Sequence, residues 1–377
     1  MILKEKHKKH AELVRPRFGN YGRNELAILG APCGIIQDFA ASLIDSAGPR
    51  WNVAYIDADH AHGDEDPEPP FAGTMRMTDK IAYRQLELLS YPNKFETRPL
   101  LDSNDLILVN GNHFTGSAQV VFIHPKKKDS LERKLDRLTN VRLILKMAED
   151  DLVYEFLDPF INENTQTLCI DDSAELRDWF EAQLETTVAP LHGLVLAGGK
   201  SQRLGHDKTV IDYHGEEHWS YLAKTLSDSC DQVFVSKRPD QDSRESQYEE
   251  LDDAFVGLGP FGGILTAFKH APNNAWLVVA SDLPFASEAI DALIAQRNPS
   301  KVATAFHNPD TDFPDPLMTI WEPRAYPVLL NFLAQGYSCP RKALINSDIQ
   351  EVEVEDERWL LNVNTEDDLK RAMEELD

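Results

Sequence analysis

Short apolar runs alternate with stretches of helical spacing along almost the whole chain, and this alternation restricts the fold more than any other feature. Short apolar runs are typical of buried strands, and apolar residues three or four apart indicate one face of a helix. Their alternation predicts mostly parallel α/β sheets. In the first half, strands are predicted at 25–29, 52–56, 105–109, 120–123 and 141–145, and helices at 38–46, 129–138 and 174–184.

A second complete series follows residues 185–190, which show no periodicity. A chain of 377 residues is long for one core, so two domains are expected. We predict a basic tail at 1–20, a first domain at 21–185, a linker at 186–191 and a second domain at 192–377. Both domains are predicted to be doubly wound α/β, with ligands at the carboxyl ends of the strands. The second domain has predicted strands at 193–196, 232–236, 275–280, 302–305 and 317–321, and helices at 220–229, 264–269, 287–296 and 325–334.

Charge and composition exclude several functions. The chain carries 63 acidic and 38 basic residues, a net charge of −25, so it would repel nucleic acid. The basic run at 4–10 is interpreted as a solvated tail. No window approaches the length of an apolar membrane span. The cysteines form no Cys-x-x-Cys pair and are predicted to be buried thiols of a cytoplasmic protein; they are Cys33, Cys169, Cys230 and Cys339.

The stretch at 194–208, LVLAGGKSQRLGHDK, is the most informative part of the second domain. An apolar strand runs directly into Gly198 and Gly199, where backbone amides can approach a nucleotide without interference from Cβ atoms. Arg203 and Lys208 bring positive charge to the same loop, which suits a triphosphate. The alternative is an ordinary strand-to-helix turn with surface basic residues, and the ordered series of polar residues disfavours it.

This stretch resembles the LAGGxSxRxGxDK signature of the MobA-like nucleotidyltransferases, which include the molybdenum cofactor guanylyltransferases. Three further segments follow in the family's order. Residues 259–264, GPFGGI, are similar to its GPLxGI loop, and residues 280–285, ASDLPF, to its strand-ending CDMPF segment. Residues 362–369, NVNTEDDL, resemble its NxNTxEDL motif. The resemblance implies a Rossmann-like nucleotidyltransferase fold for the second domain.

The resemblance also implies roles for individual residues. Lys208, Arg203 and Asp282 would be catalytic, and Asp282 would bind Mg²⁺. An acceptor site would include Gly262, Asn362 and Asn364. The implied nucleotide-binding set is Leu196, Ala197, Gly198, Gly199, Lys208, Ser236, Asp252 and Asp282.

Three of these features have structural interpretations that stay open. Asp282 follows an apolar strand, at the edge where ligands sit and where a carboxylate can hold Mg²⁺, but it could instead cap the helix after Pro284. The glycines at 259–263 suit either a tight turn or close approach to a ligand. Thr365 and Asp368 form a potential capping box whatever the nearby asparagines do.

The implied reaction is Mg²⁺-dependent transfer of GMP from GTP to the terminal phosphate of molybdopterin, with release of pyrophosphate. Two alternatives remain: a related enzyme that uses CTP or another phosphorylated acceptor, and a non-catalytic binding scaffold. Ser236 stands where many guanylyltransferases of this type carry Asn, so the nucleobase stays open. No partner nucleic acid or membrane is expected.

The first domain begins with LAILGAPCGIIQ at 26–37, a strand, a loop and the start of a helix. A working P-loop ends in Gly-Lys-Ser/Thr, whereas Gly34 is followed by Ile35, Ile36 and Gln37. The acidic stretch at 57–66, with His60 and His62, is interpreted as a solvated loop rather than a metal cluster. The order of these features resembles MobB, the GTP-binding partner of molybdenum cofactor guanylyltransferase. We therefore expect a degenerate MobB-like domain that serves docking or acceptor delivery, with molybdoenzymes or their chaperones as partners.

Overall fold

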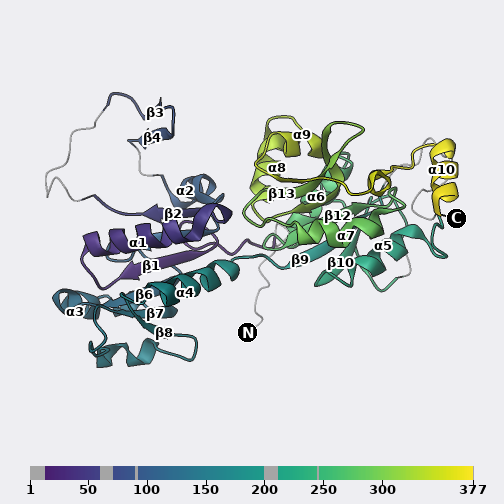
Figure 1. Cartoon of the computed structure of the whole chain (residues 1–377). Coiled ribbons are helices and arrows are strands. Elements are labelled where there is room, and N and C mark those ends of the chain that lie inside the picture. Colours follow the sequence, from purple (N-terminus) through teal and green to yellow (C-terminus); the bar gives the residue numbers. More distant parts are fainter. Residues whose placement is uncertain (1–12, 60–70, 90–91, 199–210, 244–245, 377) are drawn as a thin grey trace, which may run out of the picture. The chain divides into compact units, whose positions relative to one another are not determined.

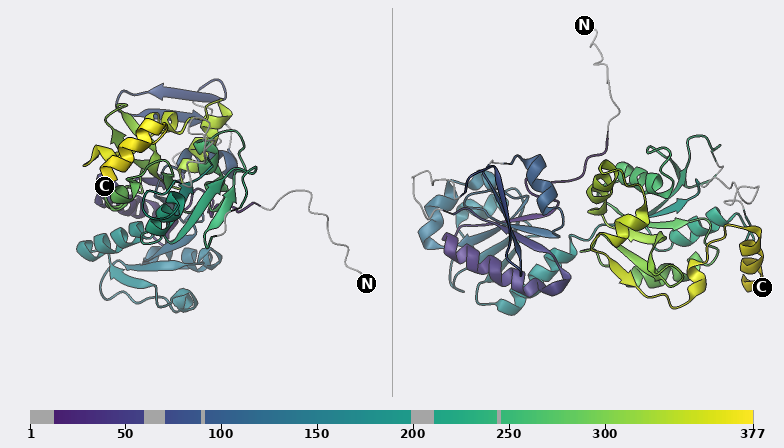
Figure 2. Two further views of the ribbon diagram at one scale, coloured as in Figure 1. Left: turned by 90° about the vertical axis from the view of Figure 1, so that its right-hand side faces the viewer. Right: turned by 90° about the horizontal axis from the view of Figure 1, so that it is seen from above.

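The computed structural model describes residues 13–59, 71–89, 92–198, 211–243 and 246–376. The chain forms two compact units: the first is Phe18–Thr187, and the second is the part from Val188 onward, which groups with the described residues before Phe18. Each unit is built around its own sheet, as the ribbon views show (Figure 1, Figure 2). The predicted fold class, two α/β domains with largely parallel sheets, is confirmed. Among the described residues, no helix combines the length and the apolar character needed to cross a membrane.

The first unit contains a parallel six-stranded sheet in the order β2-β5-β1-β6-β7-β8. Its described strands are β1 (Glu25–Leu29), β2 (Val53–Ile56), β5 (Leu106–Asn110), β6 (Ala118–Ile123), β7 (Val141–Lys146) and β8 (Gln166–Cys169). Its helices are α1 (Cys33–Ala47), α2 (Lys94–Leu101), α3 (Lys128–Glu132) and α4 (Ser173–Glu185). A separate antiparallel hairpin, β3 (Met75–Asp79) and β4 (Arg84–Leu88), was not predicted.

Strand β1 shows why this sheet is buried on both faces. Ala27 and Leu29 alternate along β1 with Leu26 and Ile28, and both pairs are buried. Successive side chains of a strand point to opposite faces, so a central parallel strand reads as a continuous apolar run. The run at 26–29 is accordingly buried throughout.

The predicted helix at 129–138 is wrong in length. Helix α3 ends at Glu132, and a 3-10 turn at Leu135–Arg137 follows it. Leu131 and Leu138 both lie in the apolar core. Lys134 and Arg137 donate hydrogen bonds to carbonyls of the loop after β5.

The second unit contains a seven-stranded sheet in the order β11-β10-β9-β12-β14-β13-β15. It is parallel except for β14, which pairs antiparallel with both neighbours. The strands are β9 (Leu191–Leu196), β10 (Gln232–Lys237), β11 (Glu249–Asp252), β12 (Ala275–Ala280), β13 (Ala303–Asn308), β14 (Phe313–Trp321) and β15 (Gln350–Val352). The described helices are α5 (His218–Leu226), α6 (Pro260–His270), α7 (Ala286–Ala295), α8 (Ala325–Ala334), α9 (Pro340–Ile345) and α10 (Glu366–Leu376).

Alternate side chains of this sheet fill two core layers. Val195 and Leu277 pack on the side of α5 and α7. Leu194 and Trp276 pack on the side of α6 and α8, where Trp276 lies opposite Trp321 of β14. Because helices cover both faces, the carboxyl ends of β9, β10 and β12 are the edge left for ligands.

Candidate functional site

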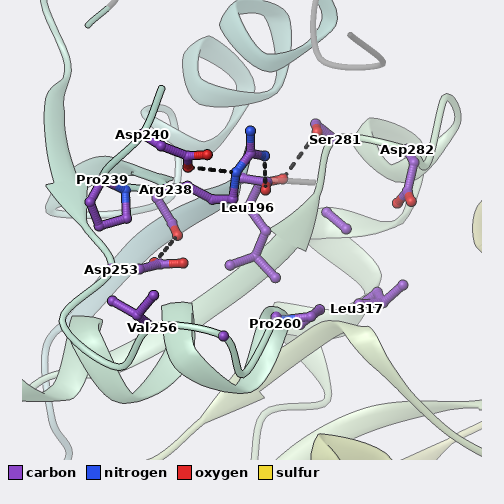
Figure 3. Close-up of a pocket in the computed structure, with 15 residues that line it drawn as sticks. Leu196, Arg238, Pro239, Asp240, Asp253, Val256, Pro260, Ser281, Asp282 and Leu317 are labelled. Carbon is purple, nitrogen blue, oxygen red and sulfur yellow. Dashed lines mark hydrogen bonds and ion pairs between the residues drawn. The ribbon is translucent and has the colours of Figure 1, made fainter. Parts of the chain in front are cut away.

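A cavity of about 680 Å³ opens at this edge of the second unit, where β9, β10 and β12 end and α6 begins (Figure 3). Its volume is within the usual range for sites that hold a small molecule. The lining is formed by Leu196, Gly198, Ser236, Arg238, Pro239, Asp240, Asp253, Val256, Gly257, Gly259, Pro260, Ala280, Ser281, Asp282 and Leu317.

The segment that follows β9 is held by side chains on the neighbouring strands. Ser281 donates to the carbonyl of Leu196 at 3.0 Å, and Gln241 donates to that of Ala197 at 3.1 Å. The Arg238 guanidinium donates to the carbonyl of Gly198 and, at 2.9 Å, to Asp240 (Figure 3). Leu196 and Gly198 line the cavity, whereas Ala197 is fully buried.

Three residues of the predicted phosphate loop lie outside the described residues: Gly199, Arg203 and Lys208. The described chain leads into that segment beside the cavity, because Gly198 is among the lining residues.

Asp282 lines the cavity two residues after β12 ends. Helix α7 begins only at Ala286 and its N-cap residue is Phe285, so Asp282 does not occupy the N-cap position of this helix. The amide of Val363 donates to the Asp282 carbonyl at 2.9 Å, which ties the segment to the C-terminal motif. Burial and the charge of Asp282 raise the pKa of Tyr213, in that order, so the phenol stays neutral beside the carboxylate.

Two histidines hold the backbone directly after Asp282. His218 contacts the carbonyl of Leu283 through Nε2 at 3.0 Å, and His214 contacts that of Pro284 at 3.0 Å. A carbonyl only accepts, so both Nε2 atoms carry the hydrogen. Burial lowers the pKa of His218 to about 4. The hydrogen bond to the Leu283 carbonyl raises this pKa in part, and the nearby His214 lowers it further, so the imidazole stays neutral.

Asp253 occupies the place that the sequence analysis gave to Asp252. Asp253 lines the cavity and accepts a hydrogen bond from the Ser236 hydroxyl at 2.9 Å. Burial raises the pKa of the Asp253 carboxyl group, and the hydrogen bond from Ser236 and the charge of Arg238 lower it in part. Asp252 is not a lining residue; it is exposed and lies 3.5 Å from Lys237. Because Ser236 is itself 2% exposed, its hydroxyl acts mainly on Asp253.

The cavity is elongated between two carboxylates. Figure 3 shows Asp253 and Asp282 at opposite ends of the pocket, with Leu196 between them. Gly259, at the start of α6, has φ of 58° and open space around it, so it both makes the turn and leaves room for a ligand.

The predicted acceptor residues are only partly at this site. Gly262 is buried in α6 and does not line the cavity; a Cβ there would meet the Phe255 carbonyl, which explains the glycine by packing. Asn362 accepts from the Asn364 amide at 2.9 Å. Both asparagines flank Val363, whose amide bonds to Asp282, so they lie near that end of the site.

The predicted capping box at the start of α10 is confirmed. The Thr365 amide donates to Asp368 at 2.8 Å, and the Asp368 amide donates to the Thr365 hydroxyl at 3.2 Å. This part of the C-terminal motif therefore fixes local structure.

Sequence reasoning missed several residues of the site: Arg238, Asp240, Asp253, Ser281, His214 and His218. The signals were weak. Arg238 and Asp240 follow a predicted strand directly, but a loop charge after a strand is usually solvated. His214 and His218 stand four residues apart, which the structure uses for two neighbouring carbonyls.

In the first unit, the turn after β1 leads into α1 without a basic residue at positions 35–37. Helix α1 begins at Cys33, and Ile36 is fully buried in its first turn. The acidic residue Asp57 accepts from Asn110 and from Tyr55, at 2.7 Å and 2.8 Å. His60 and His62 lie outside the described residues. The prediction that the cysteines are buried is right for Cys169 only; Cys339 is exposed, and Cys33 and Cys230 are partly exposed.

The fold and site of the second unit define a nucleotide-binding α/β domain, and the comparisons specify its family. The model of the MobA-like NTP transferase domain matches residues 193–351. A probable molybdenum cofactor guanylyltransferase of Mycobacterium avium is 31% identical over 197 residues, which are 48% of this chain and 93% of that protein. The chain therefore belongs to the MobA-like NTP transferase family, and its second unit is a nucleotidyltransferase domain.

Two further comparisons cover the same half. A molybdenum cofactor biosynthesis bifunctional protein of Synechocystis is 36% identical over 187 residues, 49% of this chain and 54% of that protein. The chain thus spans about half the length of this relative. The crystal structure of molybdopterin-guanine dinucleotide biosynthesis protein A from Archaeoglobus fulgidus is 26% identical, with a TM-score of 0.40, and covers 48% of this chain and 97% of its own.

Proposed function

We propose that the second unit transfers GMP from GTP to the terminal phosphate of molybdopterin and releases pyrophosphate. The single observation that carries this proposal is the cavity with one carboxylate at each end, Asp253 and Asp282. A nucleoside triphosphate is long, with hydrogen-bond donors at its base and anionic oxygens at its other end. The names of the relatives, which are molybdenum cofactor guanylyltransferases, support guanine as the base.

Asp253 suits the base end. Guanine presents an N1–H and an N2 amino group side by side, and a carboxylate can accept from both. The Ser236 hydroxyl donates to Oδ1 and orients the carboxylate. Cytosine offers only one donor on that edge, so a carboxylate there favours guanine over cytosine. This geometry supports GTP over CTP, although Asn is replaced by Ser236.

Asp282 suits the phosphate end. A carboxylate at a strand end can hold a hard divalent cation, and the phosphates of the substrate supply further oxygen ligands. We propose Mg²⁺ for this role; when bound, it would neutralise charge on the phosphates. The hydrogen bonds from His214 and His218 fix the backbone that carries Asp282. Arg203 and Lys208 are proposed to take up charge on the leaving pyrophosphate.

The reaction needs no general base from the protein. The attacking group is a phosphate oxygen, which is already ionised at neutral pH, so the protein has to position and neutralise rather than remove a proton. Asn362 and Asn364, near the Asp282 end, are proposed to contact the acceptor. The acceptor role of Gly262 stays a prediction; this residue is buried in the first turn of α6.

The test is incubation of the full chain with Mg²⁺, molybdopterin and each nucleoside triphosphate in turn, with pyrophosphate release and the dinucleotide product measured. Product with GTP and molybdopterin is expected. Product with CTP alone would change the assignment to a cytidylyltransferase, and turnover only with a different phosphorylated acceptor would remove molybdopterin. Nucleotide binding without any transfer would favour the scaffold alternative.

For the first unit we propose docking or acceptor delivery in a MobB-like arrangement, with molybdoenzymes or their chaperones as partners, in the cytoplasm. The support is the resemblance of residues 25–64 and the buried Ile36 at the position of a phosphate-binding turn. Retention of product formation by a fragment that begins near residue 190 would agree with this role.

A further inference from the structure

Cys33 and His113 meet at the carboxyl edge of the first unit's sheet. Cys33 is the first residue of α1, a helix of 15 residues that follows β1. His113 lies on the loop that follows β5. The Cys33 Sγ and the His113 Nε2 are 3.2 Å apart, within hydrogen-bonding distance for sulfur. Both side chains are partly exposed, so a small molecule can reach the sulfur.

The topology of the sheet brings these two loops together. Strand β5 lies beside β1, and the loop after it must pass over β1 to reach β6 on the other side. Gly111 begins this crossing with a hydrogen bond from its amide to the Ile28 carbonyl at 2.7 Å. A Cβ on Gly111 would come within 3.1 Å of that carbonyl oxygen, so the close approach needs glycine. The strand order reverses at β1, which is where ligands bind in such sheets.

A second contact fixes the geometry of the pair. The Asn112 amide donates to the Ala31 carbonyl at 2.8 Å and lies 3.8 Å from the Cys33 Sγ. The loop that carries His113 is therefore tied to the turn that carries Cys33 at two points.

The charge around the sulfur is mixed, with cations nearest on the loop side. Lys134 donates a hydrogen bond to the Asn112 carbonyl at 3.0 Å. Burial has the largest effect on the pKa of Lys134 and lowers it, whereas the interaction with Cys33 raises it. Arg137 donates to the neighbouring Gly111 carbonyl at 2.9 Å. On the other side stands Asp57, whose two oxygens accept from Tyr55 and Asn110. The Cys33 thiol therefore lies at a helix N-terminus, in contact with an imidazole and near a loop that binds a lysine.

We propose that Cys33 and His113 form a reactive thiol pair that takes hydroperoxides, so that Cys33 is a site of reversible oxidation. The Cys33 thiol gives its proton to His113 as the sulfur attacks one oxygen of hydrogen peroxide; an S–O bond forms and the O–O bond breaks. The sulfur loses two electrons and becomes a sulfenic acid, and the peroxide is reduced. The leaving hydroxide takes the proton held by His113 and departs as water. A small thiol then condenses with the sulfenic acid to a mixed disulfide and a second water.

The other cysteine of this unit does not suit an internal disulfide. Cys169 is buried at the end of β8, three strand spacings of about 4.8 Å from β1. A disulfide needs Cα atoms within about 7 Å. This is why the pair is assigned a small thiol as its second reactant. The inference does not depend on the nucleotidyltransferase function of the other unit.

The chain supplies its own comparison thiols. Burial raises the pKa of Cys230 to about 12, so it should be inert. Cys339 is exposed, and as the N-cap of α9 it makes no side-chain capping bond, so it reports the reactivity of an accessible thiol. Reactivity that followed exposure alone would rank Cys339 above Cys33.

The test is alkylation of the reduced full chain by iodoacetamide at pH 6.0, with the rate at each cysteine read by mass spectrometry. Cys33 is expected to react about tenfold faster than Cys339, because His113 can accept the thiol proton as the sulfur attacks. His113→Gln should remove this excess. The matched control is His124→Gln, at the end of β6 in the same unit, which should leave the rate at Cys33 unchanged.

A second measurement addresses the oxidation itself. After hydrogen peroxide treatment, a dimedone adduct is expected on Cys33 and not on Cys339, and glutathione added before dimedone should replace it with a mixed disulfide. Three results would overturn the proposal: equal alkylation rates at Cys33 and Cys339, an alkylation rate at Cys33 that is unchanged by His113→Gln, or no dimedone adduct on Cys33. If His113→Gln fails to fold, the comparison of cysteines within the unsubstituted chain still decides.

Discussion

Replacement of Asp253 by Asn tests the base end of the cavity. The substituted side chain has nearly the same shape, and its amide oxygen can still accept from the Ser236 hydroxyl, now 2.9 Å from Oδ1. The second carboxylate oxygen is replaced by an NH₂ group, which faces the donors of guanine and cannot accept hydrogen bonds from them. Hydrogen bonds to a charged group are worth about 1.5 to 3 kcal/mol, or roughly 10- to 150-fold in binding. We expect kcat/KM for GTP to fall by that factor.

The measurement is steady-state transfer with GTP and with inosine triphosphate, whose base lacks the N2 amino group. In the unsubstituted chain GTP should be preferred, and Asp253→Asn should shrink the preference because the partner of the amino group is lost. Asp252→Asn is the matched control: this neighbour is exposed and lies beside Lys237, so its effect should stay within about twofold. If Asp252→Asn impairs GTP use and Asp253→Asn does not, the assignment of the base end is wrong.

Four other predictions follow from the site and the sequence. Asp282→Asn should abolish transfer while thermal unfolding stays unchanged; near-normal turnover at saturating Mg²⁺ would remove the metal assignment. Lys208→Ala should weaken GTP binding by about 1.5 to 3 kcal/mol in titration calorimetry, and unchanged affinity and rate would contradict its phosphate contact. The pKa of His218 is lowered to about 4 in the folded chain, so as the pH falls the unfolded chain takes up this proton first. The free energy of unfolding should therefore fall between about pH 6.5 and pH 4, by up to about 3 kcal/mol. His218→Gln should flatten this part of the denaturation profile, and an unchanged slope would refute the assignment. A fragment that ends near residue 185 should bind GTP only at millimolar concentration or weaker and should not hydrolyse it, whereas micromolar binding would reveal a site in the first unit.

The alternation of strands and helices was predictable because the spacing of apolar residues follows which side chains face the core. The strand at 275–280 and the helix at 325–334 were predicted at their observed bounds, since each is apolar where it meets the core. Short edge elements such as β11 and β15 were missed. They have few buried positions, so their apolar pattern is too brief to be recognised.

The site was predictable where a residue's position along a strand decides its role, as for Leu196 and Asp282. It was not predictable where the choice lies between neighbours. Asp252 and Asp253 stand at the end of β11, and successive residues of a strand point to opposite sides. The pairing of Asp252 with Lys237 of β10 sends it away from the cavity and leaves Asp253 with Ser236. That register comes from tertiary structure and has no local sequence signal.

The two units show how one architecture carries different chemistry at the same edge. In each, a central parallel strand ends in a glycine-bearing turn, at Gly30 in the first unit and at Gly198 in the second. After Gly198 the sequence adds basic residues, which suits phosphates. After Gly30 it adds Cys33 and then Ile36, whose side chain is fully buried. A lysine at position 36 would point into the core and would not rebuild a phosphate site, because the helix face there is fixed by packing. The carboxyl edge of the first unit therefore carries a thiol and an imidazole in contact, and we propose that its chemistry lies in that pair.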